Sequence, residues 1–264
     1  MNLKKLFTRS LVMSALAAAS LAAHAELDDI RAAKKIRISV DLAVPPSGMT
    51  DSNMKPTGSD YDVAALLAKD LGVALEIVPT VGATRIPNLQ TNKADLVIAT
   101  LAWTPERAKV VEYSLPYAGQ VSLVGGVKSL NVKSMADLAG KSVAVNRSTT
   151  QDTDLTTNAK GATVVRYDDD AGVITAVVTG QADLVGTSQA LFLTMQAKAP
   201  QRQLEPKFVL RTNELGIGMR FGEPKLKEWV NGWIRTNMAN GKLNEIFKKY
   251  HGADLPEVIV NKAK

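Results

Sequence analysis

The sequence of 264 residues contains no cysteine, and its only histidines are His24 and His251. Without cysteine, the chain has no disulfide, no thiolate metal ligand and no thiol nucleophile. Zinc hydrolases and Ser-His-Asp enzymes depend on clustered imidazoles, so two isolated histidines argue against both classes. Aromatic residues make up only 5% of the chain, and no basic stripe is interleaved with them, which argues against a nucleic-acid partner. We therefore expect no metal, no cofactor and no nucleic-acid ligand.

The one long apolar segment, residues 11–23, lies near the N-terminus behind Lys4, Lys5 and Arg9. It is shorter than the ~20 residues that a membrane span requires. Residues 23–25 have the A-x-A form of a cleavage site. We therefore predict a signal peptide over residues 1–25 that is removed on export, and a mature protein in the periplasm, where disulfides are permitted but not required. A membrane anchor is the alternative.

Strand and helix patterns alternate along the rest of the chain. Residues 35–41 alternate apolar and polar side chains, and residues 95–100 are nearly all apolar, as in a strand buried on both faces. The alternation starts again after about residue 120, with strands expected at 142–146, 163–167 and 183–186. Repeated β-α-β units form open, mostly parallel sheets flanked by helices, so we predict an α/β fold with two lobes. Ligands of such sheets bind beyond the carboxyl ends of the strands, which indicates a cleft between the lobes.

Arg107 is the first candidate for a ligand contact. The sequence predicts a helix that opens at Thr104, shortly after the buried strand ends. An arginine in the first turn of that helix faces the crevice at the strand end and can bind a carboxylate through two parallel hydrogen bonds. The alternative is a surface arginine that pairs with Glu106 or Asp95. Trp103 suits the border of the cleft and the core equally well.

Two polar turns supply further candidates. Thr149 and Thr150 lie where a strand meets a helix, and free backbone N–H groups at such a turn bind anions; an ordinary helix cap explains the same residues equally well. Asp168, Asp169 and Asp170 suit a cation or an ammonium group, or a solvated turn in which one acid caps the next helix. The spacing of a calcium-binding loop is absent.

Several separated motifs share one resemblance: residues 60–63, 85–99, 104–107 and 113–117 in the first half, and 134–145, 180–183 and 216–252 in the second. Together they resemble the family 3 bacterial extracellular solute-binding proteins, the periplasmic receptors of polar amino-acid ABC importers. The resemblance implies the type II periplasmic-binding-protein fold. Lobe 1 would consist of residues 26–119 and 214–264, lobe 2 of residues 120–213, with a two-strand hinge between them. It also implies a monomer, not an enzyme, that traps an amino acid or related small carboxylate by hinge closure and passes it to a permease in the inner membrane.

The same resemblance implies roles for individual residues. Arg107 corresponds to the arginine that binds the ligand α-carboxylate. Thr149 and Thr150 correspond to the lobe-2 turn that binds the same group. Thr100 and Ala102 correspond to positions whose backbone contacts the ligand.

Other positions follow the family pattern less closely. Asp41 matches an acidic position near the side-chain pocket, but Ser188 stands where the family usually has the acid for the ligand α-ammonium. Val44 and Gly82 stand where aromatic rings often enclose the ligand. Arg85 replaces a residue that is usually apolar, and a second positive contact would suit a dicarboxylate or another acidic solute.

The missing acid leaves two interpretations open. Either one of residues 168–170, with Asp169 as the candidate, binds the ammonium group, or the ligand has no standard α-amino group. A dehydratase of cyclic carboxylates such as prephenate or arogenate, on the same fold, is a second functional hypothesis. It needs a cleft acid, and we expect residues 168–170 to lie away from the cleft centre. A third hypothesis is a ligand-sensing partner of a membrane receptor.

Overall fold

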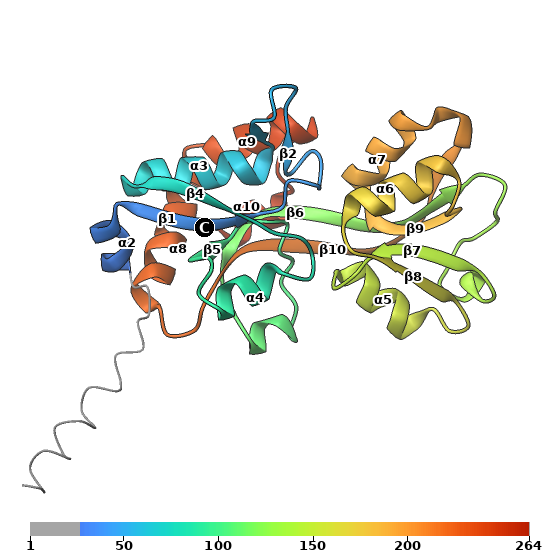
Figure 1. Cartoon of the computed structure of the whole chain (residues 1–264), viewed down its shortest axis with the longest axis horizontal. Coiled ribbons are helices and arrows are strands. Elements are labelled where there is room, and N and C mark those ends of the chain that lie inside the picture. Colours follow the sequence, from blue (N-terminus) through green and yellow to red (C-terminus); the bar gives the residue numbers. More distant parts are fainter. Residues whose placement is uncertain (1–26, 264) are drawn as a thin grey trace, which may run out of the picture.

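Two long strands connect the two halves of the molecule. The computed structural model describes residues 27–263, so the predicted signal peptide lies outside the described residues. Strands β6 (Glu112–Val127) and β10 (Leu204–Met219) pair antiparallel and carry an α/β lobe at each end (Figure 1). An eight-stranded sheet runs through both lobes in the order β4-β1-β5-β10-β6-β9-β7-β8. The predicted two-lobe α/β fold is confirmed.

The first lobe combines the N-terminal part of the described chain with the C-terminal helices. β1 (Lys35–Val40) lies parallel between β4 (Ala74–Pro79) and β5 (Leu96–Val97). A small separate sheet is formed by β2 (Met49–Thr50) and β3 (Pro56–Thr57). The helices of this lobe are α2 (Leu27–Ala33), α3 (Ser59–Leu71), α4 (Arg85–Gln90), α8 (Pro224–Ala239), α9 (Lys242–His251) and α10 (Glu257–Lys262).

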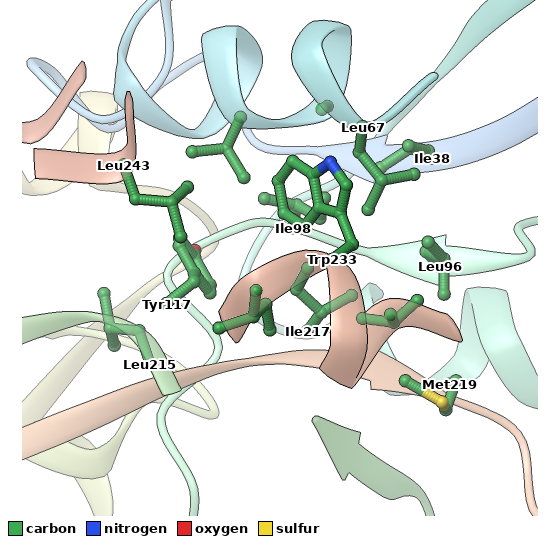
Figure 2. Close-up of a cluster of buried hydrophobic side chains, with 14 of the residues drawn as sticks. Ile38, Leu67, Leu96, Ile98, Tyr117, Leu215, Ile217, Met219, Trp233 and Leu243 are labelled. Carbon is green, nitrogen blue, oxygen red and sulfur yellow. The ribbon is translucent and has the colours of Figure 1, made fainter. Parts of the chain in front are cut away.

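The main core of this lobe lies between the sheet and its covering helices. Figure 2 shows Ile38 and Leu96 from the sheet, Leu67 from α3 and Trp233 from α8 packed in one cluster. Burying each such side chain contributes about 1.5–3 kcal/mol. The indole N–H of Trp233 donates to Asp70 Oδ2 at 2.8 Å, so the buried ring leaves no donor unpaired.

The second lobe is formed by the chain between β6 and β10. β7 (Ser142–Asn146) lies parallel between β8 (Thr163–Tyr167) and β9 (Leu184–Ser188), and β9 pairs antiparallel with β6. Helices α5 (Thr150–Asn158), α6 (Asp170–Thr179) and α7 (Gln189–Lys198) each follow one of these parallel strands. Short 3₁₀ turns lie at η3 (Ala136–Leu138) and η4 (Pro200–Arg202). Because the carboxyl ends of parallel strands meet at one edge, the three helices begin on the side that faces lobe 1.

Two predicted elements differ from the structure. The strand predicted at 95–100 is short, because the N–H of Thr100 bonds to a side chain of α3 and the backbone leaves the strand conformation. The helix predicted from Thr104 is only a 3₁₀ turn, η2 (Arg107–Lys109). The chain enters β6 at Glu112, which leaves no length for further helical turns.

The predicted hinge positions lie inside β6 and β10. Gly119 is the register partner of Glu214, and Gln120 is the partner of Asn213. Both strands therefore cross between the lobes at the same level. Within residues 27–263, no helix combines the length and the hydropathy needed to cross a membrane.

Candidate ligand-binding site

A polar cleft lies between the lobes, where the parallel strands end. Its lining comes from both lobes and from Gln120 of β6. The predicted residues that line it are Arg85, Thr100, Ala102, Arg107, Thr149, Thr150 and Ser188. Asp41, Trp103 and Asp169 are outside the lining, whereas Asn146, Gln151 and Thr187, which the sequence analysis did not single out, belong to it.

Arg107 presents its guanidinium to the cleft from lobe 1. Nη1 donates to the carbonyl of Ala102 at 2.9 Å, and Nη2 donates to the carbonyl of Ser148 in lobe 2 at 2.8 Å. These neutral acceptors orient the group without balancing its charge, and no carboxylate within residues 27–263 pairs with it. Burial lowers the pKa of Arg107 because a desolvated cation without a counter-ion is unfavourable. Asp95, the alternative partner, instead pairs with Arg37 at 2.5 Å.

A buried carboxylate holds the backbone at Thr100, a role that the sequence analysis did not predict. Asp60, in the first turn of α3, accepts the Thr100 N–H at 2.7 Å and the Tyr117 hydroxyl at 2.8 Å. Thr100 has a φ of 46°, a left-handed conformation that is unfavourable for a non-glycine residue. Burial raises the pKa of Asp60 to about 6. Asp60 thus positions the backbone of the cleft without lining it.

Arg85 and Asp41 form a buried ion pair in the wall of lobe 1. Arg85 Nη2 lies 3.2 Å from Asp41 Oδ2, and the residues are 4% and 3% exposed. Arg85 lines the cleft, while Asp41 lies behind the lining. Because Asp41 balances the charge of Arg85, Arg107 is the uncompensated cation of this wall. The second positive contact expected for a dicarboxylate is therefore already neutralised within the protein.

The N-terminus of α5 lies across the cleft, in the segment that Arg107 contacts. The Thr149 hydroxyl accepts the Asp152 N–H at 3.2 Å and donates to the carbonyl of Asn146 at 2.7 Å. The helix-cap interpretation is therefore confirmed for this side chain. The first-turn N–H groups of Thr150 and of the following residue have no acceptor within a helix, and the partial positive charge there favours an anion. Arg107 and the start of α5 together can hold a carboxylate between the lobes.

The three adjacent acids of residues 168–170 have different surroundings. Asp168 is exposed and pairs with Arg147 at 2.8 Å. Asp169 caps α6 by accepting a backbone N–H of that helix at 2.8 Å. Asp170 lines the cleft, where it accepts a hydrogen bond from Asn146 Nδ2 at 2.9 Å. Burial raises the pKa of Asp170 to about 6.

The negative charge of the lobe-2 wall thus comes from Asp170 and not from the position of Ser188. Ser188 is buried and caps α7 by accepting the N–H of Leu191 at 3.2 Å. The expectation that all of residues 168–170 lie away from the cleft centre is wrong for Asp170, because β8 ends at the cleft as β7 and β9 do. The described part of the chain has no group of three or more His, Cys, Asp or Glu side chains arranged to hold a metal ion.

The lining contains no aromatic ring within residues 27–263. Trp103 is 49% exposed and lies outside it, and Val44 contributes an apolar contact. Gly82 lies against lobe 2: a Cβ at this position would be 2.8 Å from the carbonyl oxygen of Arg147 and 3.3 Å from Asn146 Oδ1. Glycine therefore permits a close approach of the lobes that a larger side chain would prevent.

A polar cleft between two α/β lobes joined by two crossing strands is typical of binding proteins that close around a ligand. Residues 36–253 match the bacterial extracellular solute-binding proteins, family 3, and the chain belongs to this family. The resemblance noted from the separated motifs is confirmed.

Individual relatives cover nearly the whole chain. The L-cystine-binding protein TcyJ of Escherichia coli (strain K12) is 27% identical over 238 residues, which cover 89% of this chain and 90% of that protein. A mutant of ArgBP from T. maritima has a TM-score of 0.80 and 31% identity, with 86% of this chain and 99% of that chain covered. The ancestral amino acid-binding protein AncCDT-1, a precursor of cyclohexadienyl dehydratase, has a TM-score of 0.77 and 32% identity, with 85% and 98% covered.

Proposed function

We propose that this protein is the periplasmic binding component of an ABC importer and that it traps an amino acid between its two lobes. The observation that carries the proposal is Arg107, a cleft guanidinium without a carboxylate partner in the described chain, which faces the start of α5 in the other lobe. Relatives described as L-cystine-binding and amino acid-binding support an amino acid as the ligand. ArgBP is described in an arginine-bound form.

Each charged half of an α-amino-acid head group has a partner of opposite charge in the cleft. The α-carboxylate accepts hydrogen bonds from Arg107 and from free N–H groups of α5, and each charge-assisted bond contributes about 1.5–3 kcal/mol. The α-ammonium pairs with Asp170, which Asn146 holds in place. Thr100, Ala102, Thr150 and Ser188 line the same space. We leave Asp169 and Trp103 out of the proposed site because neither lines the cleft.

Trapping requires the lobes to move about the crossing strands. We propose lobe boundaries at residues 26–119 with 214–264, and at 120–213, and the pairing of Gln120 with Asn213 supports them. The Arg107–Ser148 hydrogen bond joins the lobes and belongs to a closed arrangement. A ligand that contacts both lobes stabilises that arrangement over an open one, since its contacts to the second lobe exist only after closure.

The cellular setting follows from the same proposal. The signal peptide directs export to the periplasm, and the loaded monomer delivers its ligand to a permease in the inner membrane. Membership in a family of bacterial extracellular solute-binding proteins supports this setting. We propose neither an enzymatic activity nor a cofactor for this role.

A thermal-shift screen of the standard amino acids and their des-amino analogues tests the proposed function. A ligand at 100 times its dissociation constant should stabilise the protein by about 2.7 kcal/mol and raise its melting temperature. We expect a small set of amino acids to do so. The proposal fails if none does, or if every active compound lacks an α-amino group.

Asp170 also favours a second candidate function, a dehydratase of cyclic carboxylates. A cleft acid with a pKa of about 6 is partly protonated just below neutral pH and can give its proton to a leaving hydroxyl, which departs as water while the ring carboxylate leaves as CO2 and its bonding electrons complete the aromatic ring. The similarity to a precursor of cyclohexadienyl dehydratase motivates the test. Incubation with prephenate or arogenate, followed by the absorbance of the aromatic product, separates the two functions, and we expect no product.

A further inference from the structure

Three buried polar atoms of the cleft lining have no hydrogen-bond partner within residues 27–263. They are Arg85 Nε, Asn146 Oδ1 and Thr187 Oγ1. The three residues are 4%, 2% and 4% exposed. An unpaired polar group at this depth is unfavourable, so the concentration of three such atoms in one cleft indicates a ligand group that pairs with them.

We propose that Arg85, Asn146 and Thr187 form a side-chain subsite that selects an amino acid with a neutral side chain able to donate and accept hydrogen bonds, with a carboxamide as the best match. The inference rests on the proposed function, because it takes the α-carboxylate and α-ammonium to be held by Arg107 and Asp170.

The charges of the cleft argue for a neutral side chain. Arg107 matches the α-carboxylate and Asp170 matches the α-ammonium. Arg85 is the only other charged residue of the lining within residues 27–263, and Asp41 already balances it at 3.2 Å. If the ligand side chain carried a charge of either sign, no residue in the described part of the cleft would be left to pair with it.

The unpaired atoms also define which hydrogen bonds the side chain must make. Arg85 Nε can only donate. Asn146 uses its Nδ2 to donate to Asp170 Oδ2, which leaves its Oδ1 as an acceptor. A carboxamide supplies the matching oxygen and N–H groups, with the Thr187 hydroxyl able to serve either. A carboxylate would place an oxygen against Asn146 Oδ1, and an ammonium or guanidinium group would face Arg85.

The subsite is assembled from both lobes. Arg85 begins α4 in lobe 1, and Asn146 and Thr187 lie on β7 and β9 in lobe 2. Gly82, three residues before Arg85, lies against Asn146, since a Cβ on Gly82 would be 3.3 Å from Asn146 Oδ1. The side chain of the ligand can therefore contact all three residues only when the lobes are closed.

Calorimetric titration of the purified protein with L-glutamine, L-asparagine, L-glutamate, L-aspartate and L-arginine tests the subsite. We expect at least one carboxamide to bind about tenfold or more tightly than its carboxylate counterpart and than arginine, because a site built to hydrogen-bond one group rejects analogues that leave it unpaired. The inference is overturned if glutamate, aspartate or arginine binds as tightly as the better carboxamide.

The Asp41→Asn variant provides an independent readout. It removes the charge that balances Arg85 without changing the cleft lining, so the cleft gains one positive charge. We expect the ratio of glutamate affinity to glutamine affinity to rise about tenfold, as an unpaired charge gains a partner. A purely structural role for Asp41 would weaken both ligands equally and would contradict the charge argument. The wild-type panel still decides the inference if this variant does not fold.

Failure of the subsite and failure of the proposed function give different results. If no amino acid binds to the wild-type protein, the proposed function fails, and the subsite with it. If amino acids bind and Arg107→Ala abolishes their binding, but charged side chains are preferred, the proposed function stands and the subsite is wrong.

Discussion

The two walls of the cleft hold their polar groups in different ways. The lobe-1 wall uses charged side chains that contacts within the lobe hold in place: the Ala102 carbonyl orients Arg107, and Asp41 orients Arg85. The lobe-2 wall is made from the starts of helices. Each of α5, α6 and α7 begins at the cleft with a capping side chain, namely Thr149, Asp169 and Ser188.

This difference separates residues that build a wall from residues that can touch a ligand. In lobe 2 the capping side chains are used within their own turns, and the residues that follow two of them, Thr150 and Asp170, line the cleft. In lobe 1 the guanidinium of Arg107 itself faces the cleft without a carboxylate partner among the described residues. Substitutions in lobe 1 should therefore affect binding directly, whereas in lobe 2 neighbouring substitutions should separate stability from binding.

The largest effect is expected from Arg107→Ala. The variant leaves the ligand carboxylate in the cleft without its charged partner, and we expect binding to weaken by about 2–5 kcal/mol. Arg147→Ala is the matched control, because Arg147 is exposed and pairs with the exposed Asp168. Isothermal titration of both variants checks the prediction. Equal losses of affinity would contradict the role of Arg107.

Asp170→Asn should have the next largest effect. It removes the negative charge that faces the ligand ammonium, and we expect a loss of about 1.5–3 kcal/mol in affinity for an amino acid. Asp169→Asn is the control in the lobe-2 comparison, since asparagine caps a helix as well as aspartate does. The control should keep both the affinity and the melting temperature. If Asp169→Asn lost more affinity than Asp170→Asn, Asp169 and not Asp170 would be the partner of the ligand ammonium.

Acidic pH should weaken binding, while protonation of Asp60 and Asp170 by itself favours the folded, ligand-free protein. The pKa values of Asp60 and Asp170 are raised to about 6 in the folded protein, above their ordinary value of 3.8. Since the folded state takes up these protons first, both groups favour folding increasingly as the pH falls from about 6 towards 4. Protonated Asp170 no longer pairs with an ammonium, so affinity should fall about tenfold between about pH 7 and pH 5. Calorimetric ligand titrations between about pH 7 and pH 5 check whether affinity falls as the pH falls. The Asp170→Asn variant should lose most of this pH dependence.

Gly82→Ala should have the smallest effect on binding and should act through closure. The added Cβ meets the carbonyl oxygen of Arg147 at 2.8 Å across the cleft. We expect binding to weaken by about 1 kcal/mol with little change in the unfolding of the ligand-free protein, because an open form relieves the contact. Gly232→Ala is the control, since a Cβ added at this position would have no neighbouring atom within 4 Å. If Gly82→Ala binds as the wild type does, the lobes do not need this close approach.

The fold and part of the site could be predicted from local patterns. Alternating strands and helices predict parallel sheets, and a parallel sheet fixes the edge where ligands bind, so Arg107 and Thr150 could be named as candidates. The local pattern left a surface arginine and an ordinary helix cap open as alternatives. The choice of Asp170 over Asp169 could not, because any acid of residues 168–170 can cap a helix. Which one faces the cleft depends on where β8 ends and α6 begins, to within one residue.

Other features depend on contacts between distant parts of the chain. Arg85 and Asp41 are 44 residues apart, and their pairing follows from the position of α4 beside the end of β1. Neither local motif indicates that Asp41 balances the charge of Arg85. Asp60 lies 40 residues before Thr100, and the hydrogen bond between them exists only once α3 packs on the sheet.

The central claim is that both lobes hold the head group of an amino acid, with Asp170 recognising its α-ammonium. The most direct test is calorimetric titration of the strongest amino-acid ligand and its des-amino analogue, with the wild-type protein and with Asp170→Asn. The account predicts that the wild type prefers the amino acid by about tenfold or more and that Asp170→Asn removes most of this preference. Equal affinity of the wild-type protein for the two compounds would contradict it.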